Sequence, residues 1–186
     1  MIGKSFDEVL VAARSGEEWA LEFLYRSLAP PVLGYIRGSG MADFEDLTSE
    51  VFVAVTRHLH RFEGDEAAFR SWVFSIAHRR MADERRRLAR RPEVATDPVA
   101  MTKAVEAVAV GNVEEEALAR LRGQWALRLL GRLTREQRDV LLLRVLADLS
   151  VEQVAAILGR SPGAVKALQR RALRRLARTI DREAVP

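Results

Sequence analysis

Apolar residues recur along most of this chain at intervals of three or four positions, which is the spacing that places them on one face of an α-helix. The pattern is clearest in residues 43–61, where Leu47, Val51, Val55 and Leu59 occupy every fourth position. No segment alternates apolar and polar residues over several positions, as a half-buried strand would. The pattern therefore predicts an all-α protein.

Capping residues indicate where the individual helices begin. A Ser or Thr followed three positions later by Glu or Gln forms a capping box, which satisfies two backbone N–H groups at the helix start. Proline is tolerated in the first turn, so Pro30 and Pro31 predict a new helix that runs to about Arg37. The capping boxes are Ser5 with Glu8, Thr134 with Gln137, and Ser150 with Gln153. The predicted helices span residues 5–14, 16–28, 30–37, 43–61, 66–90, 112–133, 134–147 and 150–158, and the last one begins at 161.

A break in the pattern divides the chain into two parts. Pro92 ends the long helix, and residues 92–113 contain two prolines and many small residues without a sustained helical period. Such a composition is typical of a tether. We therefore expect two small helical domains, residues 1–91 and 114–186, joined by a flexible linker at 92–113.

Charge is segregated along the chain, although the formal net charge is only +4. Residues 1–78 carry 7 basic and 12 acidic residues, a net charge of −5, and residues 79–91 carry 7 and 2, a net charge of +5. Residues 92–117 carry 1 basic and 6 acidic residues, a net charge of −5. Residues 118–186 carry 15 basic and 6 acidic residues, a net charge of +9. Two separate positive blocks suggest a polyanion bound at two places, although solvated helix faces would give the same pattern.

The composition excludes several classes of protein. With 48% hydrophobic and 30% charged residues, the chain is typical of folded proteins rather than disordered ones. No apolar run reaches the roughly 18 residues that a membrane helix needs, and no basic-then-apolar leader opens the sequence. Cysteine is absent, which excludes disulfides and thiolate metal ligands and fits a reducing cytoplasm.

The segment 149–178 has the pattern of a helix-turn-helix. Its first helix ends at Gly159, a residue that adopts the left-handed backbone of a helix C-terminus, and Ser161 can cap a second helix two positions later. Ala155 is small where the two helices must cross closely, and Val165 supplies the apolar contact from the second helix. A plain helical hairpin is the alternative, which the Ala-x-x-x-Gly-x-Ser spacing and the basic second helix disfavour.

In this motif the second helix enters the major groove of DNA by its N-terminal end. Further basic side chains along the same helix can reach phosphates, which gives binding without sequence preference. The residues expected at the N-terminal end are Arg160, Ser161, Gly163, Ala164, Lys166 and Ala167, and those expected to reach phosphates include Arg170, Arg171 and Arg174.

Two blocks of the sequence resemble domains of one family. The segments "FEDLTSEVFVAVTRHLHRF" and "FRSWVFSIAHRRMADERRRLARR" resemble the polymerase-binding and promoter-opening domain of bacterial sigma factors. The segment "LTREQRDVLLLRVLADLSVEQVAAILGRSPGAVKALQRRALRRL" resembles their fourth domain, which carries the helix-turn-helix. With no domain between the two blocks, the chain is similar to the extracytoplasmic-function (ECF) class.

This resemblance implies a factor without catalytic residues, metal, cofactor or small-molecule substrate. Its expected partners are core RNA polymerase, through the β′ clamp helices and the β flap, and promoter DNA. Whether an anti-sigma protein is a further partner stays open.

The acidic segment 92–117 matches the part that threads the RNA exit path in this family, although a simple tether fits equally well. The polymerase-contacting positions implied by the resemblance are Glu45, Asp46, Leu47, Glu50 and Phe52.

The resemblance also implies contacts with the minus-ten promoter element. The loop "RFEGDEAAF" matches the segment that captures an unstacked base, so Phe62 is expected to stack on it, or else to belong to the core. Glu63 and Asp65 can accept hydrogen bonds from a base edge. On the following helix the implied DNA contacts are His78, Arg79, Arg80, Arg85, Arg86 and Arg87.

Two other functions fit parts of the sequence. A stand-alone helix-turn-helix repressor or activator would bind duplex DNA as a dimer without polymerase. A carboxylate metal site could use Asp43, Asp46 and Glu50, although no histidine lies in register with them and the first turn of a helix attracts acids in any case.

Overall fold

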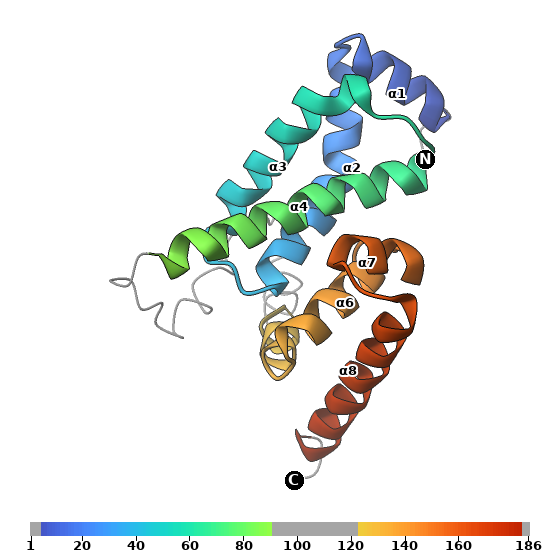
Figure 1. Ribbon diagram of the computed structural model, residues 1–186. Helices are drawn as coiled ribbons and strands as arrows, with labels where there is room; N and C mark the ends of the chain where they lie inside the picture. Colours follow the sequence, from blue (N-terminus) through green and yellow to red (C-terminus); the bar gives the residue numbers. More distant parts are fainter. Residues whose placement is uncertain (1–4, 91–122, 184–186) are drawn as a thin grey trace, which may run out of the picture.

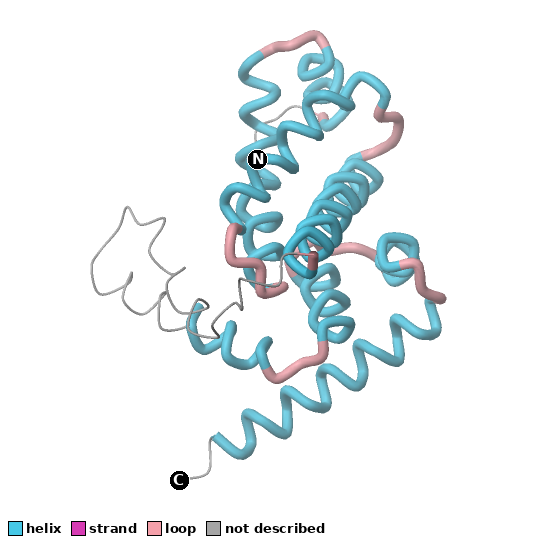
Figure 2. Tube along the Cα trace, turned by 60° about the vertical axis from the view of Figure 1, so that its left-hand side comes forward, coloured by secondary structure: helices cyan, strands magenta, loops and turns pink. Residues whose placement is uncertain are grey.

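The computed structural model describes residues 5–90 and 123–183, and every regular element within these two ranges is a helix (Figures 1 and 2). The prediction of an all-α protein is confirmed for this part of the chain. The predicted linker at 92–113, and the predicted start of a helix at residue 112, lie outside the described residues.

The N-terminal module is a bundle in which α3 packs against both α2 and α4, and α1 packs across the start of α2 (Figure 1). Tyr35, Phe69, Phe74 and Met81 are among its largest fully buried side chains. A short 3₁₀ turn extends α3 before the loop that leads to α4. Its elements are α1 (Phe6–Arg14), α2 (Glu18–Gly38), α3 (Phe44–His58), η1 (Leu59–Arg61) and α4 (Glu66–Ala89).

Helix α2 runs through both prolines, so the prediction of a new helix at Pro30 is wrong. Each proline removes one backbone donor from the interior of the helix, which normally breaks or kinks it. Here an apolar stripe continues on both sides of the prolines, because Leu24, Leu28 and Val32 are all buried on one face. Burial of this continuous stripe holds the helix in one piece.

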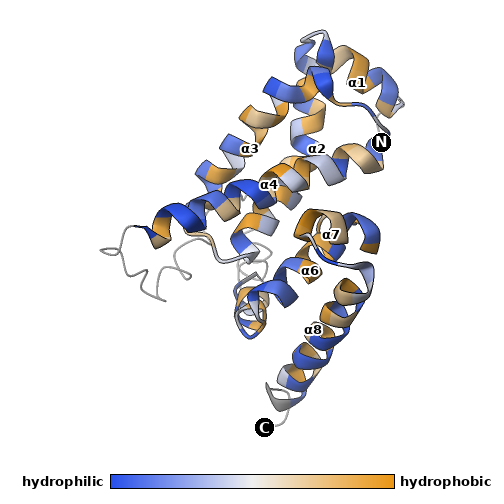
Figure 3. Cartoon of the chain, viewed as in Figure 1, coloured by the Kyte–Doolittle hydropathy of each residue, from blue (hydrophilic) through white to orange (hydrophobic). Residues whose placement is uncertain are grey.

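The C-terminal module consists of helical residues 123–131 followed by α6 (Arg135–Val145), α7 (Val151–Leu158) and α8 (Pro162–Glu183). Helix α8 packs against both α6 and α7. Leu133, Leu141 and Ala172 form a small apolar cluster between α8 and the α6 region. Hydrophilic residues cover much of α8 and the C-terminal part of α4 (Figure 3).

The three predicted capping boxes are confirmed, at Ser5, Thr134 and Ser150. In the third, the hydroxyl of Ser150 accepts the backbone N–H of Gln153 at 3.1 Å, and the Ser150 N–H donates to Oε1 of Gln153 at 2.8 Å. These bonds satisfy two donors that the first turn of α7 leaves without helical partners. Local sequence therefore determines where this helix begins.

The two modules pack against each other, a placement that the sequence leaves open. Helix α6 contacts α2, and α7 contacts α4. One apolar core runs through both modules, and it includes Tyr35 and Phe74 together with Leu142, Leu143 and Val154. The sequence did not indicate this arrangement, because the periodicity of a helix shows which face is buried but not which neighbour covers it.

We predict that Ser150→Ala destabilises the protein by about 1 kcal/mol, since the start of α7 loses its cap. Urea unfolding followed by circular dichroism measures this change. The matched control is Ser27→Ala, whose exposed hydroxyl bonds only to the Phe23 carbonyl inside α2. If both variants lose the same free energy of unfolding, the capping role of Ser150 is contradicted.

Candidate functional site

Helices α7 and α8 have the geometry of a helix-turn-helix. Gly159 ends α7 in the left-handed region, with φ of 61° and ψ of 40°. The N–H of Arg160 donates to the Ala155 carbonyl at 2.9 Å, and the Ser161 hydroxyl then accepts the N–H of Ala164 at 3.2 Å. Ala155 and Val165 are both buried in the shared core, as the crossing of the two helices requires.

The N-terminal part of α8 exposes the side chains that a recognition helix would present to DNA. Ala164 and Ala167 are half-buried, and a methyl group at Gly163 would meet no atom within 4 Å. Arg160 forms an ion pair with Glu136 of α6, which holds it at the edge of this surface. The remaining predicted residues, Ser161, Lys166, Arg170, Arg171 and Arg174, are exposed.

The outer face of α3 carries the predicted acidic cluster. Glu45, Asp46 and Glu50 are exposed, but Leu47 and Phe52 are only 5% and 9% exposed. Both side chains belong to the core of the N-terminal module, and their contact with a partner stays a prediction. Burial of Leu47 and Phe52 fixes the position of α3, whose outer surface carries the acidic side chains.

Three further exposed residues extend the acidic face toward the end of α3. Val53 is 48% exposed, although it is apolar, and Ser49 and Thr56 are exposed beside it. Counting steps of three and four from Asp46 reaches Ser49, Glu50 and Val53, so helical spacing would have found them. We define the α3 docking face as Glu45, Asp46, Ser49, Glu50, Val53 and Thr56.

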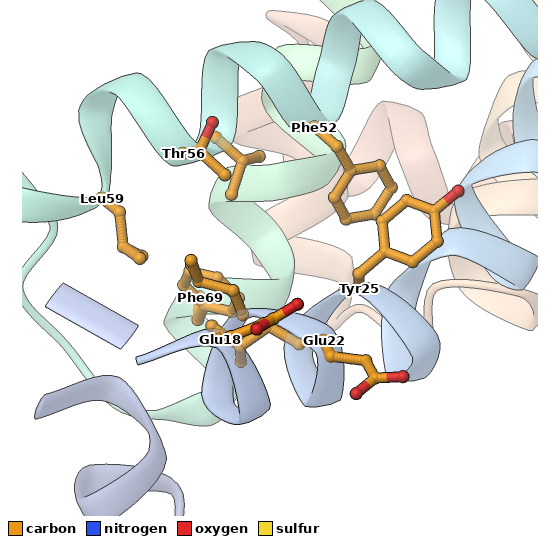
Figure 4. Close-up of a pocket in the computed structure, with 10 residues that line it drawn as sticks. Glu18, Glu22, Tyr25, Phe52, Thr56, Leu59 and Phe69 are labelled. Carbon is orange, nitrogen blue, oxygen red and sulfur yellow. The ribbon is translucent and has the colours of Figure 1, made fainter. Parts of the chain in front are cut away.

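An apolar cavity of about 300 Å³ opens behind this face, between α2, α3 and α4 (Figure 4). The ring of Tyr25 packs edge-on against Phe52, with ring centroids 4.8 Å apart. Glu18 and Glu22 of α2 also line the cavity. The cavity is therefore an apolar recess with two carboxylates in its lining.

The loop before α4 buries its aromatic residue. Phe62 is 7% exposed, and its ring centroid lies 5.1 Å from that of Phe69 and 5.2 Å from that of Trp72. The Arg14 guanidinium donates to the Phe62 carbonyl. The structure therefore places Phe62 in the core, the alternative to stacking on a base. Glu63 and Asp65 are exposed, and the Asp65 carboxylate caps α4 by accepting the N–H of Ala68 at 2.7 Å.

The arginines toward the end of α4 form two groups. Arg79, Arg86 and Arg87 are exposed, and the last two pair with acids one turn earlier on α4. Arg80 lies 3.6 Å from the Glu50 carboxylate of α3, so an ion pair joins the basic end of α4 to the α3 docking face. This group can face an external partner.

His78 and Arg85 face the C-terminal module instead. The Tyr35 hydroxyl bonds Nδ1 of His78 at 2.8 Å, and burial lowers the pKa of His78, with Asp139 opposing this shift and Arg85 adding to it. Nη2 of Arg85 donates to the Ser39 carbonyl at 3.3 Å. Both side chains are half-buried and bond within the molecule, and their contact with DNA stays a prediction.

The alternative metal site gains no support from the geometry. Within residues 5–90 and 123–183, no group of three or more histidines and carboxylates is arranged to hold a metal ion. In the same two ranges, no helix is both long and apolar enough to cross a membrane.

Comparison with known proteins agrees with the two modules. The profile for sigma-70 region 2 matches residues 24–91, and the profile for sigma-70 region 4 matches residues 123–176. The chain is 36% identical over 171 residues to the ECF RNA polymerase sigma factor ShbA of Streptomyces griseus, covering 88% of this chain and 89% of ShbA. The chain belongs to the ECF sigma factors.

Other relatives agree with this membership. ECF RNA polymerase sigma factor BldN of Streptomyces coelicolor is 34% identical over 179 residues, which cover 95% of this chain and 66% of BldN. Among solved structures, CnrH in complex with the cytosolic domain of CnrY matches with a TM-score of 0.65 and 24% identity, over 95% of this chain and 97% of CnrH. The structural match supports the fold of this sigma factor.

We predict that His78 makes the sigma factor less stable in mild acid. Its pKa is lower in the folded than in the unfolded chain, so the unfolded chain binds the proton more readily and stability falls as pH drops below about 6.5. Urea midpoints at about pH 7.5 and about pH 5.5 bracket this interval. Between these two pH values, the urea midpoint of the His78→Gln variant should fall less than that of the wild type.

The matched control for this comparison is His58→Gln, which removes an exposed imidazole from α3. This variant should keep the pH dependence of the wild type. If His78→Gln keeps the pH dependence of the wild type, the half-buried imidazole does not contribute to it.

Proposed function

We propose that this sigma factor binds core RNA polymerase through the α3 docking face, carries the enzyme to a two-part promoter, and helps to separate the DNA strands. The observation that carries the proposal is the presence of two exposed surfaces of opposite charge on two modules. One is the acidic face of α3, and the other is the basic start of α8. An acidic face suits a basic protein partner, and a basic helix-turn-helix suits DNA.

The α3 docking face combines charge with an apolar patch. Glu45, Asp46 and Glu50 supply negative charge, and the exposed Val53 supplies apolar area on the same side. Charges at the rim of an interface steer association and set orientation, while apolar residues at its centre contribute most of the affinity. This combination fits the β′ clamp helices of the polymerase, and a contact of the C-terminal module with the β flap belongs to the same proposal.

The two modules would bind separate DNA elements. The start of α8, with Lys166 at its exposed face, would read the minus-thirty-five element in the major groove. The exposed Arg79, Arg86 and Arg87 of α4 would hold phosphates near the minus-ten element, where Glu63 can accept a hydrogen bond from a captured base. The factor itself would make or break no covalent bond, and it would act where the polymerase is, in the cytoplasm.

A regulatory protein partner belongs to the same proposal. The CnrH structure contains the cytosolic domain of CnrY. By analogy, an anti-sigma protein would bind this chain and withhold it from the polymerase.

We predict that Asp46→Arg combined with Glu50→Arg weakens binding to core polymerase, because two repulsive charges replace two attractive ones. Each like-charge contact at an interface is unfavourable, so a loss of at least about tenfold, or about 1.4 kcal/mol, is expected. Biolayer interferometry with immobilised core polymerase measures the affinity. Helix content should not change, since both side chains are exposed.

The control for total charge is Glu17→Arg combined with Glu66→Arg, two exposed positions away from the α3 docking face. This pair changes the net charge by the same amount and should bind polymerase like the wild type. Wild-type affinity in the α3 variant would rule out docking through this face.

A separate prediction concerns the recognition helix. Lys166→Ala should weaken binding of the polymerase holoenzyme to promoter DNA and reduce the slope of log affinity against log salt by about one if Lys166 contacts a phosphate. If Lys166 contacts a base edge, the loss of about 1–3 kcal/mol should be confined to one base pair. The control, Arg26→Ala, removes an exposed cation of α2 that pairs with Glu22. Identical behaviour of both variants would remove Lys166 from the DNA interface.

A further inference from the structure

The loop between η1 and α4 is fixed at both of its ends. We call residues 62–65 the minus-ten loop, since the proposed function assigns base capture to it. At its first residue, the ring of Phe62 is buried in the core of the N-terminal module. At its last residue, the carboxylate of Asp65 caps the start of α4. The two residues between these anchors are Glu63 and Gly64.

Gly64 lets the minus-ten loop pass close to the first turn of α4. Its φ of 141° lies in a region that residues with a side chain rarely adopt. A methyl group at this position would lie 2.9 Å from Cβ of Ala68 and 3.2 Å from Cζ of Phe62. The loop therefore follows a path that glycine alone permits here, and it leaves the neighbouring Glu63 exposed.

A side chain of α1 fixes the backbone just before Glu63. The guanidinium of Arg14, which precedes Phe62 by 48 positions, donates to the Phe62 carbonyl. This carbonyl and the N–H of Glu63 belong to one planar peptide unit, so a bond to the oxygen restrains the orientation of the whole unit. Arg14 thereby constrains the direction in which the backbone enters the residue that would accept a hydrogen bond from a captured base.

Helix α1 is itself held by the aromatic cluster that buries Phe62. The ring centroid of Phe6, in the first turn of α1, lies 5.5 Å from that of Phe69. The Phe62 ring packs on the same Phe69 and on Trp72. Helix α1 also contacts η1, which leads directly into the minus-ten loop (Figure 1). One end of α1 is therefore tied to the cluster, and Arg14 at its other end reaches the loop.

From these contacts we propose that Arg14 is a positioning residue for recognition of the minus-ten element. Through the Phe62 carbonyl it holds the minus-ten loop in a single conformation that presents Glu63 to an unstacked base. This inference rests on the proposed function, which assigns base capture to this loop. A loop ordered before binding loses less conformational entropy when the base arrives. Loss of the Arg14 bond should therefore weaken selection of that base and leave the α3 docking face unchanged.

Nuclear magnetic resonance relaxation of the free full-length chain tests the anchoring without polymerase or DNA. In the wild type, the backbone order parameters of Glu63 and Gly64 should be near about 0.85, the value of rigid backbone. Arg14→Met keeps the apolar stem but removes the donor, so these order parameters should fall below about 0.6. Because Arg14 is exposed, the helix content should not change. Wild-type order parameters in Arg14→Met would overturn the proposal.

Two further variants separate the bond from other effects of the cation. A basic residue in the last turn of a helix also stabilises that helix, so loss of charge alone needs a control. Arg26→Met removes an exposed cation of α2 that pairs with Glu22, and the loop should stay rigid in this variant. Arg14→Lys keeps a charged donor on a long stem and should restore most of the order at Glu63. Equal loosening of the loop in Arg14→Met and Arg26→Met would contradict a specific role of Arg14.

The effect on recognition is measured with holoenzyme assembled from core polymerase and the full-length chain. The probe is a single-stranded oligonucleotide with the non-template minus-ten sequence of a promoter found by run-off transcription, in which each base is replaced in turn. One hydrogen bond to a base edge corresponds to discrimination of about tenfold at one position. In Arg14→Met this discrimination should fall to about threefold or less, while Arg14→Lys keeps most of it. Discrimination at the other positions and affinity for core polymerase should match the wild type.

The pattern of the loss distinguishes positioning from a general structural role. A module that is merely destabilised would bind all oligonucleotides more weakly by the same factor, and this result would overturn the proposal. Wild-type discrimination by Arg14→Met would overturn it as well. If the wild-type holoenzyme itself selects no base in the minus-ten element, the proposed function is contradicted and the recognition role of Arg14 with it. The order parameters would then still show whether Arg14 anchors the loop.

Discussion

The close approach of α6 to the end of α2 is the contact on which the rest of the structure depends. It is possible because Gly38 presents no side chain to Leu142. That approach merges the apolar residues of the two modules into one core and brings Asp139 next to Ser39. It also sets α7 beside the start of α4. The two modules, whose relative placement the sequence leaves open, are thereby packed together.

Helix α4 contacts helices of both modules. On one side, Arg80 reaches the Glu50 carboxylate and ties α4 to the α3 docking face. On the other side, Arg85 faces the C-terminal module and shares Ser39 with Asp139. Arg85 is followed directly by Arg86 and Arg87, which are exposed and are candidates for DNA contact.

The sequence was sufficient for features that depend on neighbouring residues. The capping box at Ser150 and the left-handed Gly159 follow from local backbone chemistry, and both appear where they were predicted. Predictions failed or stayed open where distant residues decide. Burial of the apolar stripe along α2 overrode the proline signal at Pro30, and contacts with Phe69 and Trp72 drew Phe62 into the core. The inward position of Arg85 required knowledge of which helix covers the end of α2, and no periodicity contains that information.

Sigma activity itself is tested most directly by run-off transcription with purified core RNA polymerase and a library of genomic promoter fragments. Core polymerase alone should give no specific transcripts, and addition of the chain should give transcripts of defined length from a small set of fragments. Those fragments should share two short sequence elements at a constant separation. The opposite result would be specific duplex binding by a dimer of the chain with no polymerase-dependent transcript, and it would identify a stand-alone DNA-binding regulator in place of a sigma factor.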